Sequence, residues 1–458
     1  MLNDDIAAIS TPPGEGGIAI VRLSGQNVAE KISAIFKPYN PGKRIETRDS
    51  HTLTLGWLLD DEGDIIDEVL VSIMKAPHSY TGENVIEINC HGGNIVAQRC
   101  LEAILALDIR LAEAGEFTRR AFLNGRLDIS QAEAVIEVIR AKSEKSLKLA
   151  IKQLTGHNSQ YMTAIEEQLL KVNAHIQASI DFPDEVGDVD INEVSSILAG
   201  TEEIIEQMLE ESKRTDIYRQ GISVAIIGKP NVGKSSLLNA LLRKNRAIVT
   251  NIPGTTRDTI EEHITIGGIP VKLIDTAGIR ITEDMVEQLG VKKSEEVISE
   301  ADLVIWVLDF AAGITEEDME IYNKIAGKKR IVLVNKEDLE LNISEAELNK
   351  LFTGERIIKA SVKEDSGIKN LEKQIAEIIL SGQVKQDDLK IMLNMRQKSA
   401  LKKAKKHIHE AQHIMHTAPL DCLAIDLELA LESIGELTGK NIKEEVLNRI
   451  FHDFCIGK

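Results

Sequence analysis

The chain has 458 residues, which is long enough for about three domains with ample cores. Its formal net charge of −19 makes the surface as a whole repel nucleic acid, so any RNA would have to bind at a local basic patch. The four cysteines are scattered, the acidic start lacks a signal-peptide pattern, and no apolar run is long enough to span a membrane. We therefore expect a reduced, cytoplasmic protein without membrane contact.

The segment up to about Phe117 predicts a mixed α/β domain. Apolar runs indicate strands, and a loop at Cys90–Gly93 opens a helix that extends to about Leu107. For Cys90 and His91, we favour packing within this loop over metal binding. The predicted strands are Ile18–Gly25, Thr52–Leu59, Glu68–Met74 and Val85–Asn89.

A helical pattern begins near Ser130, where Ser130–Glu133 matches a capping box. The pattern is interrupted at Asp181–Glu185 and resumes from Asn192 to about Thr215. A second helical block covers Asp387–Ile450. Because the two blocks flank a segment of different character, we expect them to pack as one helical domain with that segment inserted. The two ends of the insertion should then lie close together on its surface.

The inserted segment contains the most specific local pattern, Gly228–Ser235, which has the form G-x-x-x-x-G-K-S. An apolar β-branched run, Ile222–Ile227, precedes it, and a helix-compatible run, Ser236–Leu242, follows it. In this strand, loop and helix context the pattern predicts a phosphate cradle, because backbone N–H groups and the helix start both favour anions. Lys234 would reach the β- and γ-phosphates, and Ser235 offers a hydroxyl to Mg²⁺.

Strands and helices alternate between about Gln220 and Leu380, which favours a mostly parallel, doubly wound sheet with helices on both faces. An antiparallel hairpin is predicted at His263–Ile274, with its turn at Gly267 and Gly268. Continuous apolar runs predict buried strands at Leu303–Leu308, Ile331–Val334 and Ile357–Ile358.

Three further stretches occur in the order that a guanine-nucleotide switch requires. Gly254–Asp258 contains a threonine hydroxyl suited to Mg²⁺, and Asp275–Gly278 ends a strand with groups suited to Mg²⁺ and the γ-phosphate. Asn335–Asp338 follows another strand, where ligand sites of open α/β sheets lie. The Asp338 carboxylate only accepts hydrogen bonds, and guanine offers it N1–H and a 2-amino group, whereas adenine does not. We therefore predict GTP binding.

The residue after Gly278 is Ile279, where many small GTPases have the glutamine that orients the attacking water. Isoleucine cannot hydrogen-bond water, so hydrolysis needs a polar group from elsewhere. Glu283, Asp284 and Glu287 are nearby candidates, although their residue types alone favour a solvated acidic surface. Two arginines, Arg257 and Arg280, are open to interpretation as arginine fingers or as surface charges.

The last five residues, Phe454–Lys458, have the sequence FCIGK. Together with the nucleotide motifs, this segment resembles the MnmE (TrmE) family of tRNA-modification GTPases, and the resemblance covers essentially the whole chain. Phe454–Lys458 is the most specific match, because many GTPases share the nucleotide motifs. The resemblance implies an α/β plus all-α protein with a tetrahydrofolate-binding-type, dimerising α+β domain (1–118) and a P-loop GTPase domain (216–381) inserted into a helical domain (119–215 and 382–458). Further matches are Thr11–Gly14, Tyr80–Glu83, His91–Gly93, Gly115–Phe117 and Arg120–Asn124.

The resemblance also implies a reaction and its partners. The family is understood to act as a homodimer that forms a heterotetramer with a flavoprotein, MnmG (GidA). Together they add an aminomethyl or carboxymethylaminomethyl group to C5 of the wobble uridine of certain tRNAs, using a one-carbon unit from a 5-formyl- or methylene-tetrahydrofolate. Matching positions for folate contacts are Arg22, Glu87, Arg126 and Lys458, with arginine at position 126 where relatives can have lysine. Whether Cys455, the candidate reactive thiol, reacts or only packs is open.

For the GTPase domain, the resemblance assigns catalysis to Glu287, acting through water, together with Lys234. It replaces the arginine finger with K⁺, bound by Asn231, Thr250, Ile252 and Thr255 in a nucleotide-dependent dimer, where a cation would neutralise developing charge. Mg²⁺ is assigned to Ser235 and Thr256. The GTP contacts are Asn231, Val232, Gly233, Lys234, Ser235, Ser236, Thr250, Asn251, Ile252, Pro253, Gly254, Thr255, Thr256, Asp275, Thr276, Ala277, Gly278, Asn335, Lys336, Asp338 and Ser361.

A cluster of lysines offers a local basic patch for tRNA phosphates on this acidic chain, although a solvated helix face explains it equally well. The lysines are Lys398, Lys402, Lys403, Lys405 and Lys406, followed by His407 and His409.

Two alternative functions stay open. One is a ribosome-assembly or signalling GTPase without modification chemistry, and the other is folate chemistry in the N-terminal domain without RNA.

Overall fold

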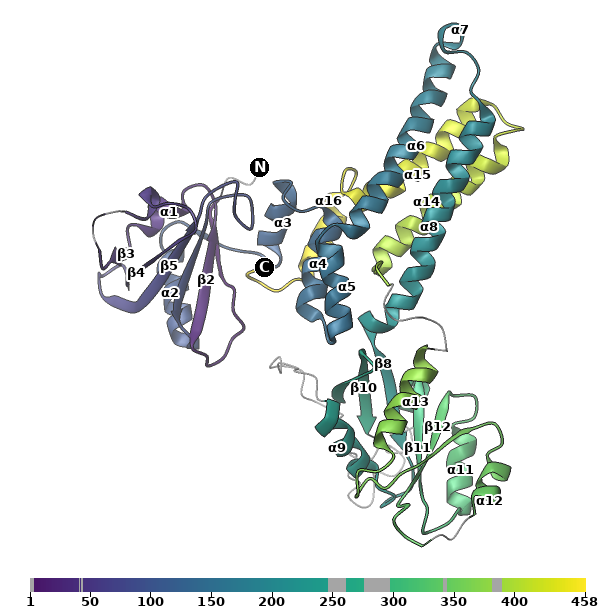
Figure 1. Cartoon of the computed structure of the whole chain (residues 1–458). Helices are drawn as coiled ribbons and strands as arrows, with labels where there is room; N and C mark the ends of the chain where they lie inside the picture. The colour runs from purple at the N-terminus through teal and green to yellow at the C-terminus, as the bar shows by residue number, and fades with distance from the viewer. Residues whose placement is uncertain are drawn as a thin grey trace, which may run out of the picture. The chain divides into compact units, whose positions relative to one another are not determined.

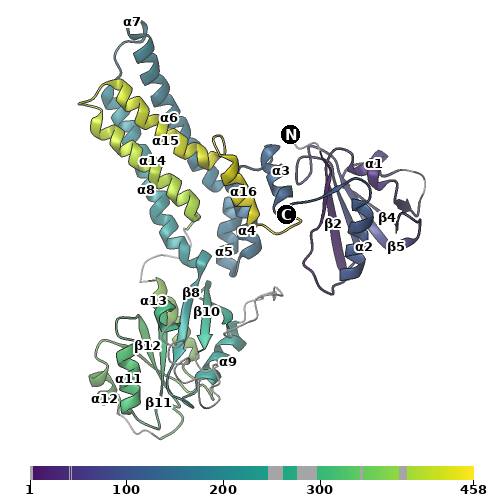
Figure 2. The same cartoon turned by 180° about the vertical axis from the view of Figure 1, so that it is seen from behind.

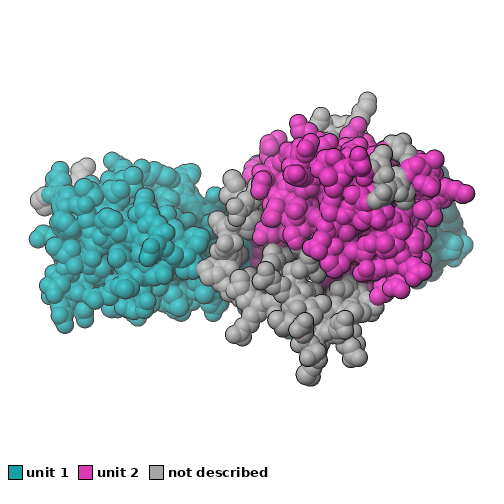
Figure 3. All heavy atoms as spheres, turned by 90° about the horizontal axis from the view of Figure 1, so that it is seen from below, with its two compact units in different colours: residues 1–136, 153–206, 394–458 teal, residues 137–152, 207–393 magenta. Residues whose placement is uncertain are grey.

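The computed structural model describes residues 4–40, 42, 44–245, 261–275, 297–340, 344–380 and 389–458. Contacts divide the chain into two compact units, coloured separately in Figure 3. Unit 1 comprises Met1–Ile136, Gln153–Glu206 and Asn394–Lys458, and unit 2 comprises Glu137–Lys152 and Gln207–Leu393.

The N-terminal part of unit 1 is a seven-stranded sheet in the order β3-β4-β5-β6-β2-β1-β7. Neighbouring strands are antiparallel except β1 and β7, which are parallel. The strands are β1 Ile6–Ile9, β2 Ile18–Ser24, β3 Phe36–Pro38, β4 Thr52–Leu59, β5 Ile65–Met74, β6 Val85–His91 and β7 Arg110–Leu111. All four predicted strands are confirmed as β2, β4, β5 and β6, whereas β1, β3 and β7 were not predicted.

The core of this sheet forms because inward-facing residues alternate along its strands and meet the apolar stripe of α2 (Asn94–Leu105). Ala97, Cys100 and Ile104 line that stripe at helical spacing, and Cys90 of β6 is buried with them. The remaining helices of this part are α1 (Val28–Ile32), the 3₁₀ helix η1 (Ile45–Thr47) and α3 (Glu116–Leu123). Figures 1 and 2 show α2 against the sheet from opposite sides.

Long helices make up the rest of unit 1 and its connections, and α15 lies beside both α6 and α14 (Figure 1). Their apolar residues recur at helical spacing, as in α14, where Leu401, Ala404, Ile408 and Ala411 are buried. The helices are α4 Ile129–Arg140, α5 Glu144–Leu154, α6 His157–Asp181, α7 Pro183–Val186, α8 Ile191–Gln220, α14 Met395–Ile414, α15 Leu420–Thr438 and α16 Glu444–His452.

The predicted capping box at Ser130–Glu133 is wrong. Helix α4 begins earlier, and its start has a reciprocal pair in which Asp128 and Gln131 each accept a hydrogen bond from the other's backbone N–H, at 2.8 and 3.0 Å. Ser130 and Glu133 are instead buried, and Glu133 pairs with Arg396 of α14 at 2.7 Å. Ser130 and Glu133 therefore serve the packing of α4 against its neighbours and do not mark the start of the helix.

Unit 2 contains a six-stranded sheet in the order β13-β12-β11-β8-β10-β9, parallel except for the β9–β10 hairpin. The hairpin, its glycine turn and the three buried strands are confirmed. The strands are β8 Ile222–Ile227, β9 Glu261–Ile266, β10 Ile269–Asp275, β11 Leu303–Asp309, β12 Arg330–Asn335 and β13 Arg356–Lys359.

Apolar side chains cover both faces of this sheet, because parallel strands bury residues on each side. One core includes Leu237 of α9 (Lys234–Asn245) and Leu371 of α13 (Ile368–Leu380). The core on the other face includes Leu348 of α12 (Glu345–Leu351), and the partly buried Met319 of α11 (Glu316–Lys324) packs against it. This is the doubly wound architecture that the sequence predicts.

The two ends of the inserted segment lie together, as expected. Thr215 Oγ1 donates to the carbonyl oxygen of Ile391 at 2.9 Å, and the backbone N–H of Ile391 donates to Glu211 Oε1 at 2.9 Å. The fold class, a P-loop domain inserted into a helical domain after an α+β domain, is therefore confirmed. No helix in the described part of the chain is long and apolar enough to cross a membrane.

Candidate guanine-nucleotide site and a second polar cluster

The phosphate loop connects the end of β8 at Ile227 with the start of α9 at Lys234. Gly233 has φ +105°, and a Cβ on it would lie 2.3 Å from Asn335 Nδ2, so no other residue fits without displacement. Asn231 also has a positive φ, 64°, which asparagine tolerates better than most residues. Glycine at position 233 therefore lets Asn335 pack directly against the backbone of the phosphate loop.

Lys234 points back into this loop. Its Nζ donates to the carbonyl oxygens of Gly228 and Lys229, each at 2.7 Å. Ser235 and Ser236 are exposed in the first turn of α9, where free backbone N–H groups attract anions. These residues supply an ammonium group, hydroxyls and a helix start, which is the donor set for a nucleoside phosphate and its Mg²⁺.

Asn335 connects the phosphate loop to the loop that follows β13. It is buried, its Nδ2 donates to the carbonyl oxygen of Val232 at 2.8 Å, and its Oδ1 accepts from the backbone N–H of Val362 at 3.1 Å. Each end of the amide therefore makes one hydrogen bond to the protein and keeps one further hydrogen-bonding position. Asn335 thus fixes the two loops relative to each other, and its contact with the base stays a prediction.

Asp338 presents the carboxylate expected for guanine. Ser361 Oγ donates to Asp338 Oδ1 at 2.6 Å, and this hydrogen bond lowers the pKa of Asp338 from its ordinary value. Asp338 is thus ionised at neutral pH and accepts hydrogen bonds only. Lys336 has φ 68° and pairs with Asp309 Oδ2 at 2.5 Å. Asp309 was not predicted, although its place at the carboxyl end of β11 is a signal for a site residue.

Several predicted site residues lie outside the described residues. Asp275 ends β10, and its backbone pairs with Ile226 of β8, directly before the phosphate loop. The structure therefore brings together Asn231–Ser236, Asn335, Lys336, Asp338 and Ser361 around one sheet edge. The residues outside the description are Thr250, Asn251, Ile252, Pro253, Gly254, Thr255, Thr256, Arg257, Asp258, Thr276, Ala277, Gly278, Ile279, Arg280, Glu283, Asp284 and Glu287.

A second polar cluster, in unit 1, brings together the four residues predicted to contact folate. Arg22 Nε donates to Glu87 Oε1 at 2.9 Å, since these residues face each other on the paired strands β2 and β6. The guanidinium groups of Arg22 and Arg126 both approach the ring of Tyr80, at 5.4 and 5.0 Å from its centroid. Lys458 joins the cluster, where burial and then the charge of Arg22 lower its pKa.

The segment Phe454–Lys458, called here the FCIGK segment, reaches this cluster from the other end of the sequence. Ser10 Oγ and Arg22 Nη1 both donate to the carbonyl oxygen of Gly457, at 3.0 and 3.3 Å. The Phe117 N–H donates to the Lys458 carbonyl oxygen at 3.1 Å, and Phe454 is buried. Cys455, in contrast, is exposed and reduced. Tyr80 and Phe117 were not predicted as cluster residues, although Tyr80–Glu83 and Gly115–Phe117 were noted as family-like stretches.

A cavity of about 550 Å³ lies within unit 1, between the loop Thr11–Gly16, the start of α2 and Ile456 of the FCIGK segment. Its lining is mainly apolar, with Ile18, Ala97 and Leu101 among the side chains. Its size suits a small organic molecule. The cavity and the polar cluster thus share the FCIGK segment.

The lysine cluster on α14 is partly neutralised. Lys405 forms an ion pair with Glu206, and Lys406 Nζ lies 3.6 Å from Glu410 Oε1. His409 Nδ1 lies 3.7 Å from Glu202 Oε1. Lys402 and Lys403 are exposed on the same helix. The helix face is therefore a mixed charged surface, which weakens the case for a phosphate-binding patch there.

The phosphate loop, the carboxylate of Asp338 and the doubly wound sheet define the inserted module as a guanine-nucleotide-binding P-loop domain. Family models described as "MnmE helical domain" and "GTP-binding protein TrmE N-terminus" match residues 129–455 and 5–126. The chain therefore belongs to the MnmE (TrmE) family.

Curated relatives match over the full length. A protein named tRNA modification GTPase MnmE from Syntrophomonas wolfei is 60% identical over 459 residues, covering 100% of both chains. Proteins of the same name from Thermoanaerobacter pseudethanolicus and Bacillus mycoides are 49% and 46% identical, with coverage of 100% and 99% of each chain. The resemblance inferred from the motifs is thereby confirmed.

Proposed function

We propose that this chain is a GTP hydrolase that takes part in tRNA modification, adding a carboxymethylaminomethyl or aminomethyl group to C5 of the wobble uridine. The observation that carries the proposal is a buried Asn335 that ties the phosphate loop to the loop bearing Ser361, which in turn orients the guanine-selecting carboxylate of Asp338. Full-length identity of 60% to a tRNA modification GTPase supports the coupling to tRNA.

The residues around the phosphate loop fit GTP and Mg²⁺. Lys234 would exchange its two carbonyl partners for phosphate oxygens, and Ser235 would bind the metal ion through its hydroxyl. Bound Mg²⁺ neutralises charge on the β- and γ-phosphate oxygens. The chain's own contribution is positioning: Gly233 lets the loop close, and Asp338 orients the base.

K⁺ is proposed as the second cation, with Asn231, Thr250, Ile252 and Thr255 as its oxygen ligands in a dimer of nucleotide-binding domains. A monovalent cation beside the β- and γ-phosphates would do the work of an arginine finger. GTP turnover should therefore be at least about tenfold faster in K⁺ than in Na⁺ at equal ionic strength. Steady-state phosphate release in matched chloride salts checks this, and equal rates would contradict a K⁺ site.

Glu287 is proposed to orient the attacking water, because Ile279 cannot do so. Glu287→Ala should lower single-turnover hydrolysis by about 10²-fold or more while GTP affinity changes little, since a water-positioning group acts mainly in the transition state. Rapid-quench kinetics and nucleotide titration separate the two quantities. Glu283→Ala, a nearby acid, serves as the control, and unchanged turnover in Glu287→Ala would rule out the role.

The cluster of Arg22, Glu87, Arg126 and Lys458 is proposed to bind a 5-formyl- or methylene-tetrahydrofolate, which would supply the one-carbon unit. Its cationic side chains suit the carboxylates of a folate, and the neighbouring apolar cavity suits a ring system. We further propose a homodimer that works with a flavoprotein of the MnmG type.

The test of the overall function is mass spectrometry of wobble uridines in tRNA from cells that lack this protein. Loss of the C5 substituent, with restoration by the intact gene, is the expected result. Unchanged levels of the C5 substituent together with defective ribosome assembly would favour the alternative, a GTPase switch without modification chemistry.

A further inference from the structure

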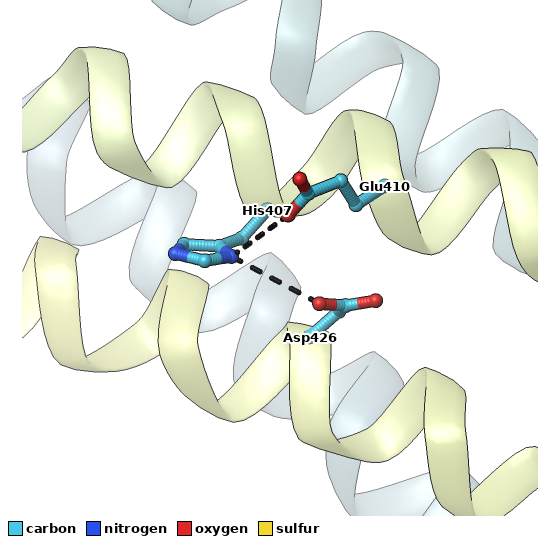
Figure 4. Close-up of side chains that lie close together, drawn as sticks. All are labelled: His407, Glu410 and Asp426. Carbon is cyan, nitrogen blue, oxygen red and sulfur yellow. Dashed lines mark ion pairs between the residues drawn. The ribbon is translucent and has the colours of Figure 1, made fainter.

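A cluster of one imidazole and two carboxylates lies on facing surfaces of α14 and α15, outside the sites described above. His407 and Glu410 stand one turn apart on α14, and Asp426 reaches them from α15 (Figure 4). His407 Nδ1 lies 3.2 Å from Glu410 Oε2 and 3.9 Å from Asp426 Oδ1. The ring nitrogen therefore faces both acids at once.

The histidine nitrogen that faces the acids has no hydrogen-bond partner within the described residues, although it is shielded from solvent. The 3.2 Å approach to Glu410 does not have the geometry of a hydrogen bond. A buried polar atom without a partner is uncommon and calls for an explanation, such as an ion. This observation is independent of the spacing of the three residues.

The two carboxylates also create an unfavourable local charge. Burial, followed by the negative charge of Glu410, raises the pKa of Asp426. Lys406 offsets this only partly, because it lies 3.6 Å from Glu410 Oε1, while the other oxygen, Oε2, faces His407. A divalent cation between the acids would remove the repulsion without displacing Lys406.

The dimensions of the cluster suit a metal ion. One ligand atom from each residue lies within 4.8 Å of the others. Around a tetrahedral ion with bonds of roughly 2.0–2.2 Å, ligand atoms stand about 3.4 Å apart, so small side-chain rotations would close the set. Helices α14 and α15 pack against each other, and the flanking residues Ile408, Leu423 and Leu427 are buried. Close packing restricts movement of the backbone where the side chains must converge.

We propose that His407, Glu410 and Asp426 bind one divalent first-row transition metal ion, which links α14 to α15. An imidazole ligand favours Zn²⁺, Co²⁺ or Ni²⁺ over Mg²⁺ and Ca²⁺, which prefer all-oxygen sites. Three protein ligands leave the remaining coordination positions to water. The proposed site uses none of the residues named above for GTP, Mg²⁺ or folate.

The test uses the full-length, untagged protein, stripped of metal and nucleotide and kept in excess Mg²⁺ to occupy all-oxygen sites. Titration with Co²⁺, followed by its visible absorption, should give one bound equivalent, and Zn²⁺ should displace it. His407→Ala and Asp426→Asn should each weaken binding by at least about tenfold, since direct metal ligands contribute at least as much as the groups that orient them. His409→Ala is the matched control, because His409 lies on the same helix but faces Glu202 of α8.

Circular dichroism verifies that each variant is folded, and Asp426→Asn, which keeps the side-chain shape, decides the matter if His407→Ala is unfolded. In the wild type, the ¹⁵N resonance of His407 Nδ1 should shift on addition of Zn²⁺. Absence of Co²⁺ binding by the wild type, or equal binding by Asp426→Asn, would overturn the proposal. In that case the cluster is only a set of contacts between the His407 imidazole and two carboxylates.

Discussion

At the residue scale, Asn335 at the end of β12 and Asp338 in the loop that follows have different roles in the nucleotide site. Asn335 uses both ends of its amide on the protein, whereas Asp338 has one internal partner, Ser361, and keeps a carboxylate for a ligand. A buried amide with satisfied partners fixes loop positions, and an ionised carboxylate selects a base that donates. Neighbouring residues of similar size thus have different roles because of their surroundings.

Asp338→Asn should change base selectivity. The NH₂ group of the asparagine would point at a hydrogen-bond donor of guanine, so one hydrogen bond to the base would be lost. Xanthine has a carbonyl oxygen at position 2, which can accept from this NH₂ group. GTP affinity should fall by about 10²-fold or more, and affinity for xanthosine triphosphate should rise. Competition binding with a fluorescent nucleotide measures both. Glu337→Gln is the control, and an unchanged GTP affinity in Asp338→Asn would show that the carboxylate does not contact the base.

At the element scale, α3 begins with a buried acid that gathers cations around it. Glu116 Oε1 accepts from Arg110 at 2.6 Å and from Arg120 at 3.0 Å, and Glu116 Oε2 accepts from the backbone N–H of Glu113 at 2.8 Å. Arg120 is 1% exposed and also pairs with Asp4. Burial alone would raise the pKa of Glu116, but the two arginines and the backbone donor outweigh it and lower the pKa. A negative charge at a helix start adds to this stability.

The stability of unit 1 should therefore depend on Glu116 being ionised. Because its folded-state pKa is below the ordinary value of 4.5, the contribution is complete above that value and is lost as the pH falls through the folded-state pKa. Glu116→Gln should lower the free energy of unfolding at pH 7 by about 2 kcal/mol, since buried Arg120 loses one of its acidic partners and the charge-assisted hydrogen bonds to the carboxylate are weakened. The variant should also lose less stability than the wild type between pH 5 and pH 3.

The measurement is urea unfolding followed by the fluorescence of Trp57 in β4. The chain has two tryptophans, so a Trp306→Phe background isolates the signal from unit 1. Glu113→Gln is the matched control, because its exposed side chain leaves the backbone donor in place. Equal pH dependence in Glu116→Gln and the control would contradict the assigned role.

At the scale of the whole molecule, residues from opposite ends of the sequence form one cluster. Arg22 and Ser10 hold Gly457 through hydrogen bonds that span more than 400 residues, and Ala114 forms an isolated bridge with Ile456. Gly457 has φ +91°, and a Cβ there would lie 2.4 Å from the carbonyl oxygen of Ile9. Only glycine allows the FCIGK segment to pass this close to β1. The segment therefore completes the N-terminal domain of unit 1.

Gly457→Ala should release the FCIGK segment. The left-handed backbone costs alanine about 1 kcal/mol, and the overlap with Ile9 adds to it, so local opening becomes frequent. Amide hydrogen exchange of Cys455–Lys458 should speed up, and folate affinity should fall, while basal GTP turnover is unchanged. Gly63→Ala is the matched control, since Gly63 has φ +88° and a Cβ there would have no neighbour within 4 Å among the described residues. Retained protection in Gly457→Ala would refute the argument.

Much of the fold was predictable because its signals are local. The apolar runs of β8, β11 and β12, the glycine turn between β9 and β10, and the long helical periodicities each report their own structure. Short elements escaped prediction, as β3 and β7 have three and two residues and owe their existence to neighbouring strands. The error at Ser130 has the same cause, since its burial depends on α5 and α14.

The sequence by itself determined the nucleotide class and the family, because the phosphate-loop pattern, Asp338 and the FCIGK segment are fixed strings whose chemistry is carried by the residues themselves. Only the tertiary structure decided which distant residues meet. It brings Lys458 to Arg22, joins Asn335 to the phosphate loop and turns Asp426 toward His407. The physical reason is that hydrogen bonds, ion pairs and metal coordination act over a few ångströms in space, whatever the separation along the chain.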